Sequence, residues 1–155
     1  MTCIAQRAPN TMAIPFQVTF DAHDPPALAR FWAIALQYVE QPPPPGFESW
    51  DDFADRMNIP EEERTARRAV VDPQDEGPRI FIQRVPEGKT AKNRVHLDLT
   101  VGGGPDVDDA TRRSRVEQHA ARLVGAGGTE VARMEEYGEF WIVMQDPEGN
   151  EFCVQ

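Results

Sequence analysis

Residues 146–154, Asp-Pro-Glu-Gly-Asn-Glu-Phe-Cys-Val, close the chain with a turn that leads into a short hydrophobic strand. A similar ending stands in the first half, where Asp72-Pro73 and a glycine-containing turn precede Ile80-Phe81-Ile82-Gln83. Proline and glycine favour the turn, and alternating apolar side chains favour the strand. The repetition predicts two modules that end in the same way.

The segments that precede the two endings also repeat. Residues 16–20 and 94–101 alternate between apolar and polar side chains, which is typical of half-buried strands. Each is followed by a segment with helical spacing of apolar residues, within 25–36 and 106–124. Further strands are expected at 69–71, 79–85, 129–134, 139–145 and 151–154. Each half therefore has the order strand, helix and then further strands, and the chain belongs to the α+β class.

An insertion interrupts the first module at residues 41–68. It begins with four successive prolines that cannot continue a helix, and it contains Trp50 and Phe53 in a segment expected to form a short helix. The expected organisation is an N-terminal tail at 1–13, a first module at 14–90 and a second module at 91–155.

Composition excludes several classes of partner. The chain of 155 residues carries 16 basic and 26 acidic residues, a net charge of -10, which repels nucleic acid and anionic lipid. Its apolar runs are far shorter than the roughly 20 residues that cross a bilayer. Two cysteines, Cys3 and Cys153, make no disulfide framework, and they would pair only if the first residues ordered against the last strand. We therefore expect a cytoplasmic protein with no nucleic-acid or membrane partner.

Three segments resemble the vicinal oxygen chelate superfamily, which includes the glyoxalase, bleomycin resistance and dioxygenase proteins. They are the helix start with its Arg30-Phe31-Trp32, the strand Lys92 to Leu99, and the closing turn and strand Asp146 to Cys153. The likeness covers about residues 14–155 and marks a glyoxalase-like protein. It implies two βαβββ modules, with paired curved mixed sheets around a cavity and helices on the outer faces.

In metal-dependent members of this superfamily, the first and last strands of each module supply four ligands to a divalent cation. The matching positions here are Gln17, Gln83, His96 and Cys153. His96 fits the superfamily pattern, whereas Cys153 stands where glutamate is usual. Neutral amides compensate poorly for the water that a cation loses, so no cofactor is expected. If a divalent metal binds, these four residues would be its ligands.

His96 and Asp98 lie two apart on one face of the expected strand, so they are candidates for an acid-base pair. The alternative is structural: a hydrogen bond holds His96, and Asp98 fixes a loop or an arginine. Cys153 is a candidate soft ligand or nucleophile, and alternatively a small apolar filler. Aromatic side chains near the cavity would stack on a flat ligand or simply belong to the core. The expected ligand-cavity residues are Gln17, Thr19, Trp50, Phe81, Gln83, His96, Trp141 and Cys153.

Three functions remain open from sequence. The favoured one is binding of a small organic molecule in the cavity without the usual catalytic metal. The second is a metal-dependent lyase or dioxygenase with an altered ligand set, and the third is a non-catalytic assembly or regulatory module. Similar proteins are frequently homodimers, so the resemblance also implies a homodimer.

Overall fold

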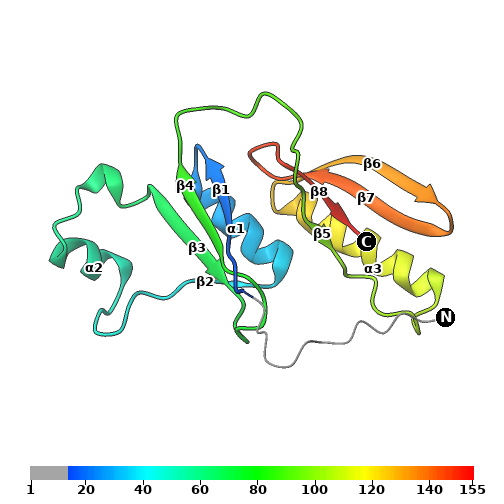
Figure 1. Ribbon diagram of the computed structural model, residues 1–155, viewed down its shortest axis with the longest axis horizontal. Coiled ribbons are helices and arrows are strands. Elements are labelled where there is room, and N and C mark those ends of the chain that lie inside the picture. Colours follow the sequence, from blue (N-terminus) through cyan, green and yellow to red (C-terminus); the bar gives the residue numbers. More distant parts are fainter. Residues whose placement is uncertain (1–13) are drawn as a thin grey trace.

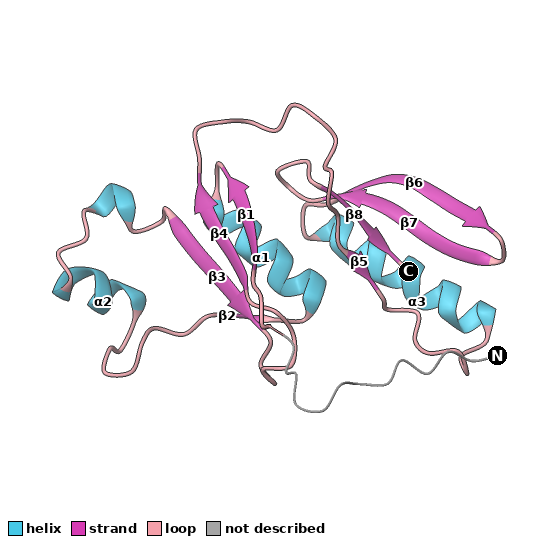
Figure 2. Cartoon of the chain, viewed as in Figure 1, coloured by secondary structure: helices cyan, strands magenta, loops and turns pink. Residues whose placement is uncertain are grey.

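The computed structural model describes residues 14–155, and the expected N-terminal tail and Cys3 lie outside the described residues. Two units of similar topology lie side by side, each with a four-stranded sheet and a long helix (Figures 1 and 2). The first unit comprises β1 (Val18–Ala22), α1 (Pro25–Leu36), β2 (Val39–Glu40), α2 (Trp50–Arg56), a 3-10 helix (Glu61–Glu63), β3 (Arg67–Val71) and β4 (Ile80–Arg84). The second comprises β5 (Asp98–Leu99), α3 (Asp109–Gly125), β6 (Thr129–Glu136), β7 (Glu139–Gln145) and β8 (Glu151–Val154).

Both sheets are mixed and have the same arrangement of strands. In the first, the order is β1-β4-β3-β2, and in the second it is β5-β8-β7-β6. The first and last strands of each unit pair in parallel, and the other neighbours are antiparallel. This is the βαβββ order written twice, so the α+β prediction with two such modules is confirmed.

One buried cluster joins the modules. Helix α1 begins at the N-cap Asp24, whose side chain accepts a hydrogen bond from Ala27 N, and it buries Phe31 and Trp32. Both rings contact Phe152 of β8, with ring centroids 5.8 Å and 5.2 Å away. Helix α1 therefore packs on its own sheet and on the second module, and it lies between the two sheets in Figure 1.

A buried carboxylate at the closing turn fixes this arrangement. Asp146 is 3% exposed and accepts a hydrogen bond from the indole Nε1 of Trp32 at 3.1 Å. Its other hydrogen bonds come from the backbone N–H groups of Glu148 and Asn150 and from the Asn150 amide. Burial raises the pKa of Asp146, and these donors oppose that rise by stabilising the ionised form. Glu148, two residues after Asp146, accepts hydrogen bonds from the backbone N–H groups of His23 and Asp24, both at 2.9 Å. The same turn therefore also holds the start of α1.

The sequence-based boundaries differ from the structure in several places. The strand expected at 94–101 is limited to Asp98–Leu99, because the chain before it has few neighbours to pair with and Val95 is 80% exposed. The first strand begins two residues later than expected, at Val18, and Phe16 is left largely exposed. The short strand β2 was not foreseen, since its two residues carry no periodic signal. Among residues 14–155, no helix has the length and apolar content needed to cross a bilayer.

We predict that Asp146→Ala lowers the free energy of unfolding by about 3 kcal/mol, because it leaves the buried Trp32 indole N–H and the part-buried backbone N–H groups of Glu148 and Asn150 without their acceptor. Urea unfolding followed by circular dichroism measures this loss. The matched control is Asp106→Ala, an exposed aspartate in a loop, for which we expect a change within about 0.5 kcal/mol. Equal losses in the two variants would contradict the role assigned to Asp146.

Candidate functional site

The two sheets each have an inner face, which is the face opposite the packed helices. On the first sheet, Ile80 and Ile82 are buried toward the helix side, so the alternating neighbours Phe81 and Gln83 lie on the inner face beside Thr19 and Asp21 of β1. On the second sheet, Phe152 and Val154 are buried, so Cys153 lies on the inner face beside Asp98. The sequence alternation predicted these orientations.

Three of the expected site residues meet at one point. The donor atoms of His96, Asp98 and Cys153 all lie within 4.8 Å of one another. His96 Nδ1 lies 3.0 Å from Asp98 Oδ1, and the thiol of Cys153 lies beside the same carboxylate. Both the imidazole and the carboxylate are half-exposed, with side-chain exposures of 45%. The carboxylate orients the ring so that Nε2 is available to a ligand.

The environment of Cys153 keeps its thiol protonated. Burial raises the pKa of Cys153 to about 11, and the negative charge of Asp98 and the hydrogen bond to it add to that rise. The thiol is therefore a hydrogen-bond donor at neutral pH, and it is not an activated nucleophile.

Residues of both modules line a hollow at the seam between them. This seam hollow has a volume of about 290 Å³ and lies where the edge strand β1 faces the segment leading into β5. Thr19 and Asp21 line it from the first module, and His96 and Glu151 line it from the second. Glu151 accepts hydrogen bonds from Asn93 N and Lys89 Nζ, which together lower its pKa to about 2, so it is ionised and its charge is paired with that of Lys89.

The two glutamines expected as ligands are held within the first module. Gln17 Oε1 accepts from Arg79 Nη1 at 2.8 Å, and Gln83 Nε2 donates to Asp21 Oδ1 at 2.8 Å. Gln83 lines a small surface hollow with Arg67 and Arg84, and neither glutamine is among the residues that line the seam hollow.

The strand registers show which positions of the two modules correspond. Thr19 pairs with Phe81, and Asp98 pairs with Cys153. Gln17 precedes Thr19 by two residues, as His96 precedes Asp98. The first-module counterpart of Cys153 is therefore Phe81 and not Gln83. An aromatic ring at this position offers no metal ligand, which sequence spacing alone did not reveal.

The aromatic residues fall into separate places. Trp50, Phe53 and Phe81 line one pocket between residues 41–68 and the first sheet. Trp141 is half-buried on β7, and Tyr137 is fully exposed at the β6–β7 turn with a positive φ of 54°. A single aromatic lining shared by all of these residues is therefore not formed.

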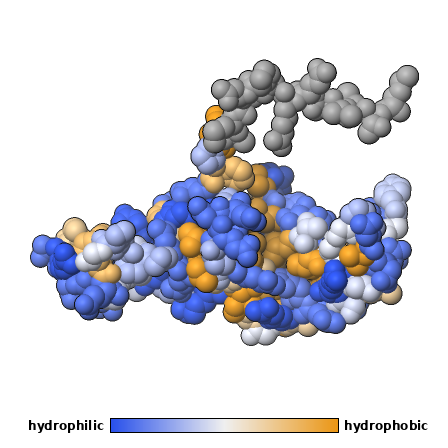
Figure 3. Space-filling view, turned by 90° about the horizontal axis from the view of Figure 1, so that it is seen from below, coloured by the Kyte–Doolittle hydropathy of each residue, from blue (hydrophilic) through white to orange (hydrophobic). Residues whose placement is uncertain are grey.

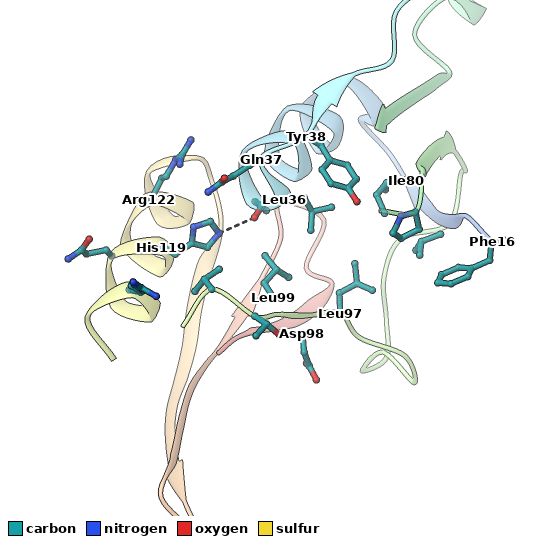
Figure 4. Close-up of a pocket in the computed structure, with 17 residues that line it drawn as sticks. Phe16, Leu36, Gln37, Tyr38, Ile80, Leu97, Asp98, Leu99, His119 and Arg122 are labelled. Carbon is teal, nitrogen blue, oxygen red and sulfur yellow. Dashed lines mark hydrogen bonds between the residues drawn. The ribbon is translucent and has the colours of Figure 1, made fainter. Parts of the chain in front are cut away.

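The largest hollow lies on the helix side of the sheets and has a volume of about 870 Å³ (Figure 4). The C-terminal end of α1, the edge strands β1 and β5, and α3 form this helix-side groove, whose apolar side chains are visible between the modules in Figure 3. His119 Nε2 lies 3.0 Å from the Ala35 carbonyl oxygen there, and burial lowers the pKa of His119. Asp98 touches this groove, but neither His96 nor Cys153 does, so the polar cluster belongs to the inner face.

Solved structures share this architecture. A fosfomycin resistance protein, FosX, from Mesorhizobium loti has a TM-score of 0.60 at 13% identity, covering 94% of this chain and 92% of that one. FosX from Listeria monocytogenes, complexed as a mutant with Mn(II) and 1S,2S-dihydroxypropylphosphonic acid, has a TM-score of 0.60 at 9% identity, with coverages of 94% and 90%. A glyoxalase/bleomycin resistance protein/dioxygenase family enzyme from Burkholderia phytofirmans PsJN has a TM-score of 0.56 at 16% identity, with coverages of 89% and 94%.

These likenesses establish the fold, because the identities are low. Comparison with curated protein sequences gives no significant match. The family comparison is more specific: the glyoxalase-like domain matches residues 17–155, which is most of the chain. The chain therefore belongs to the glyoxalase-like domain family, within the vicinal oxygen chelate superfamily.

Proposed function

We propose that this protein binds a small organic molecule in the seam hollow and that His96 is the residue that recognises its polar group. The observation that carries the proposal is the meeting of Thr19 and His96, one from each module, in the walls of one hollow. A ligand there would contact apolar side chains such as Val18 and Leu97 and hydrogen-bond to His96 Nε2. This combination of apolar walls with a few convergent polar groups is typical of small-molecule sites.

The His96–Asp98 pair also gives the site a proton acceptor. Nδ1 lies 3.0 Å from Asp98, and a carboxylate accepts hydrogen bonds, so Nε2 is the ring nitrogen left to accept a proton from a ligand. A bound molecule with an acidic proton next to Nε2 would transfer it to the ring, and Asp98 would stabilise the imidazolium that forms. The site therefore supports binding, and it supports proton transfer without a metal.

The second candidate is a metal-dependent lyase or dioxygenase with an altered ligand set. It is supported by the donor atoms of His96, Asp98 and Cys153, which lie close enough to hold one ion after small side-chain rotations. An imidazole, a carboxylate and a thiolate suit zinc, which would act as a Lewis acid on a bound oxygen. This set differs from the four residues expected from sequence, since Asp98 replaces both glutamines. A cytoplasmic location, expected from the composition and the two cysteines, remains part of the proposal, as does a homodimer, which the family resemblance implies.

A thermal-shift screen of aromatic and hydrophobic metabolites tests the seam hollow directly. A compound at 100 times its Kd should stabilise the protein by about 2.7 kcal/mol, which corresponds to a rise in Tm of about 5 °C or more. We expect His96→Gln to abolish this rise and Thr19→Val to reduce it. The matched control is His23→Gln, because His23 is also exposed but contacts the Pro86 carbonyl outside the hollow. Failure of every compound, or an undiminished rise in His96→Gln, would contradict the proposal.

Metal analysis separates the two candidates. We expect protein purified without chelator or affinity tag to contain substoichiometric zinc, manganese, iron and nickel, because the first module contributes no charged ligand. Added Zn²⁺ should likewise leave the Tm unchanged. The second candidate would instead be established if the parent protein holds one ion per chain and Cys153→Ser loses both that ion and the rise in Tm on adding Zn²⁺.

The protonation state of Cys153 gives an independent test of the cluster. With a pKa of about 11, roughly one thiol in a thousand is ionised at pH 8, so alkylation by iodoacetamide should be slow. Asp98→Asn removes the negative charge beside the thiol, which lowers the pKa of Cys153 and should accelerate alkylation several-fold. Both proteins would carry Cys3→Ser so that only Cys153 reacts, and Asp106→Asn should leave the rate unchanged. A rate in Asp98→Asn no higher than that of the parent would refute this account of the cluster.

A further inference from the structure

The insertion between β2 and β3 covers part of the inner face of the first sheet. It leaves the sheet after Gln41, whose N–H donates to the Ala69 carbonyl at 2.9 Å, and it returns at Arg67. Ser49 caps α2 by accepting a hydrogen bond from Asp52 N. Phe53 packs edge-to-face against Phe47 and Trp50, with ring centroids 4.9 Å and 5.5 Å away. The insertion is therefore a small folded unit of its own, and α2 stands beyond β3 in Figure 1.

A pocket of about 230 Å³ lies between this unit and the sheet. We call it the insertion pocket. Its floor is Ala69 and Phe81 of the inner face, and its roof is Trp50, Phe53 and Ile59 of the insertion. The indole Nε1 of Trp50 donates to the Gln41 carbonyl at 2.8 Å, which fixes the ring in the wall. Aromatic side chains from the sheet and from the insertion thus line one pocket, a composition that favours a planar aromatic ligand.

The rim of the insertion pocket is cationic, although the chain as a whole has a net charge of -10. Four arginines and two glutamates are among its lining residues, namely Arg64, Arg67, Arg68, Arg79, Glu40 and Glu63. Arg64 is paired with Asp55 and Glu61. Within residues 14–155, no carboxylate lies within ion-pair distance of the other three arginines. Their charge is therefore available to an anion.

Arg79 is held in place by groups that do not neutralise it. Its Nε donates to Gln41 Oε1 at 2.6 Å and its Nη1 to Gln17 Oε1 at 2.8 Å, and its guanidinium lies 5.0 Å from the centroid of the Phe81 ring. Arg67 is exposed at the opening and makes no hydrogen bond to another described side chain. Arg67 pairs with Gln83 in the strand register while Arg79 directly precedes Ile80, so the two arginines lie toward opposite ends of the pocket floor. The free guanidinium of Arg67, at the opening of an aromatic pocket, matches the carboxylate of an aromatic acid.

We propose that the insertion pocket is a binding site for a planar aromatic carboxylate, with the ring between Phe81 and the Trp50–Phe53 wall and the carboxylate at Arg67. This site is separate from the seam hollow: none of its lining residues lines the seam, and it uses no residue of the second module. It extends the proposed function by adding a second recognition site, and it does not depend on His96.

Isothermal titration calorimetry with 2-naphthoate at pH 7 tests this site, with 2-naphthamide as the uncharged counterpart of similar shape. We expect 2-naphthoate to bind at least about tenfold more tightly than the amide, and its affinity to fall as salt is added. Arg67→Gln should weaken 2-naphthoate about tenfold and leave the amide unchanged. Trp50→Ala should weaken both, because it removes the aromatic wall.

Two control variants distinguish binding in the insertion pocket from binding elsewhere on the protein. Arg94→Gln removes the same charge from an exposed position outside the pocket, and His96→Gln alters the seam hollow; both should bind 2-naphthoate as the parent does. Circular dichroism verifies that the Arg67 and Trp50 variants fold. Absence of binding at millimolar 2-naphthoate, equal affinity for acid and amide, or no effect of Arg67→Gln would overturn the proposal. Loss of binding in His96→Gln would place the compound in the seam hollow, which also overturns it but supports the proposed function.

Discussion

The structure depends on a buried carboxylate that connects the end of the chain to its first helix. Asp146 accepts the Trp32 indole N–H and the N–H groups of its own turn, and Glu148 in the same turn holds the backbone at the start of α1. Because a buried ionisable group is costly unless it is fully hydrogen-bonded, this geometry tolerates little displacement. It places α1 against both modules, and it thereby fixes β1 beside the segment that carries His96. The seam hollow is a consequence of that placement.

The two modules have kept one topology while their inner faces have come to differ. The second presents His96, Asp98 and Cys153, which form a polar cluster. The corresponding positions of the first are Gln17, Thr19 and Phe81, and the aromatic ring faces the insertion instead of a metal site. The chemistry is therefore concentrated in the second module, while the first supplies an apolar floor and a cationic rim. This division explains why the seam hollow and the insertion pocket differ in chemical character.

Local sequence patterns predicted the fold well because both modules depend on short-range signals. Alternation identified the faces of the strands, and an aspartate cap followed by prolines identified the start of α1. The twin turns at Asp72 and Asp146 revealed the repeat. The boundaries of the helices and strands were predicted less accurately. Strand β5 is shorter than expected because strand pairing depends on contacts between segments that are far apart in the sequence. The site was harder still. Alternation predicted that His96 and Asp98 share a face, and the family resemblance suggested Cys153 beside His96, whereas the correspondence of Cys153 with Phe81 required the strand register. The cationic rim was also missed, since its arginines come from segments that only the fold brings together.

In this account, ligands bind on the inner faces of the sheets and not in the larger helix-side groove. Chemical-shift mapping on ¹⁵N-labelled protein tests it most directly, with a compound that raises the Tm. The account predicts that the perturbed amides cluster at Thr19, His96 and Glu151, at the seam of the two modules. Perturbations confined to the groove residues Leu36, His119 and Arg122 would contradict it.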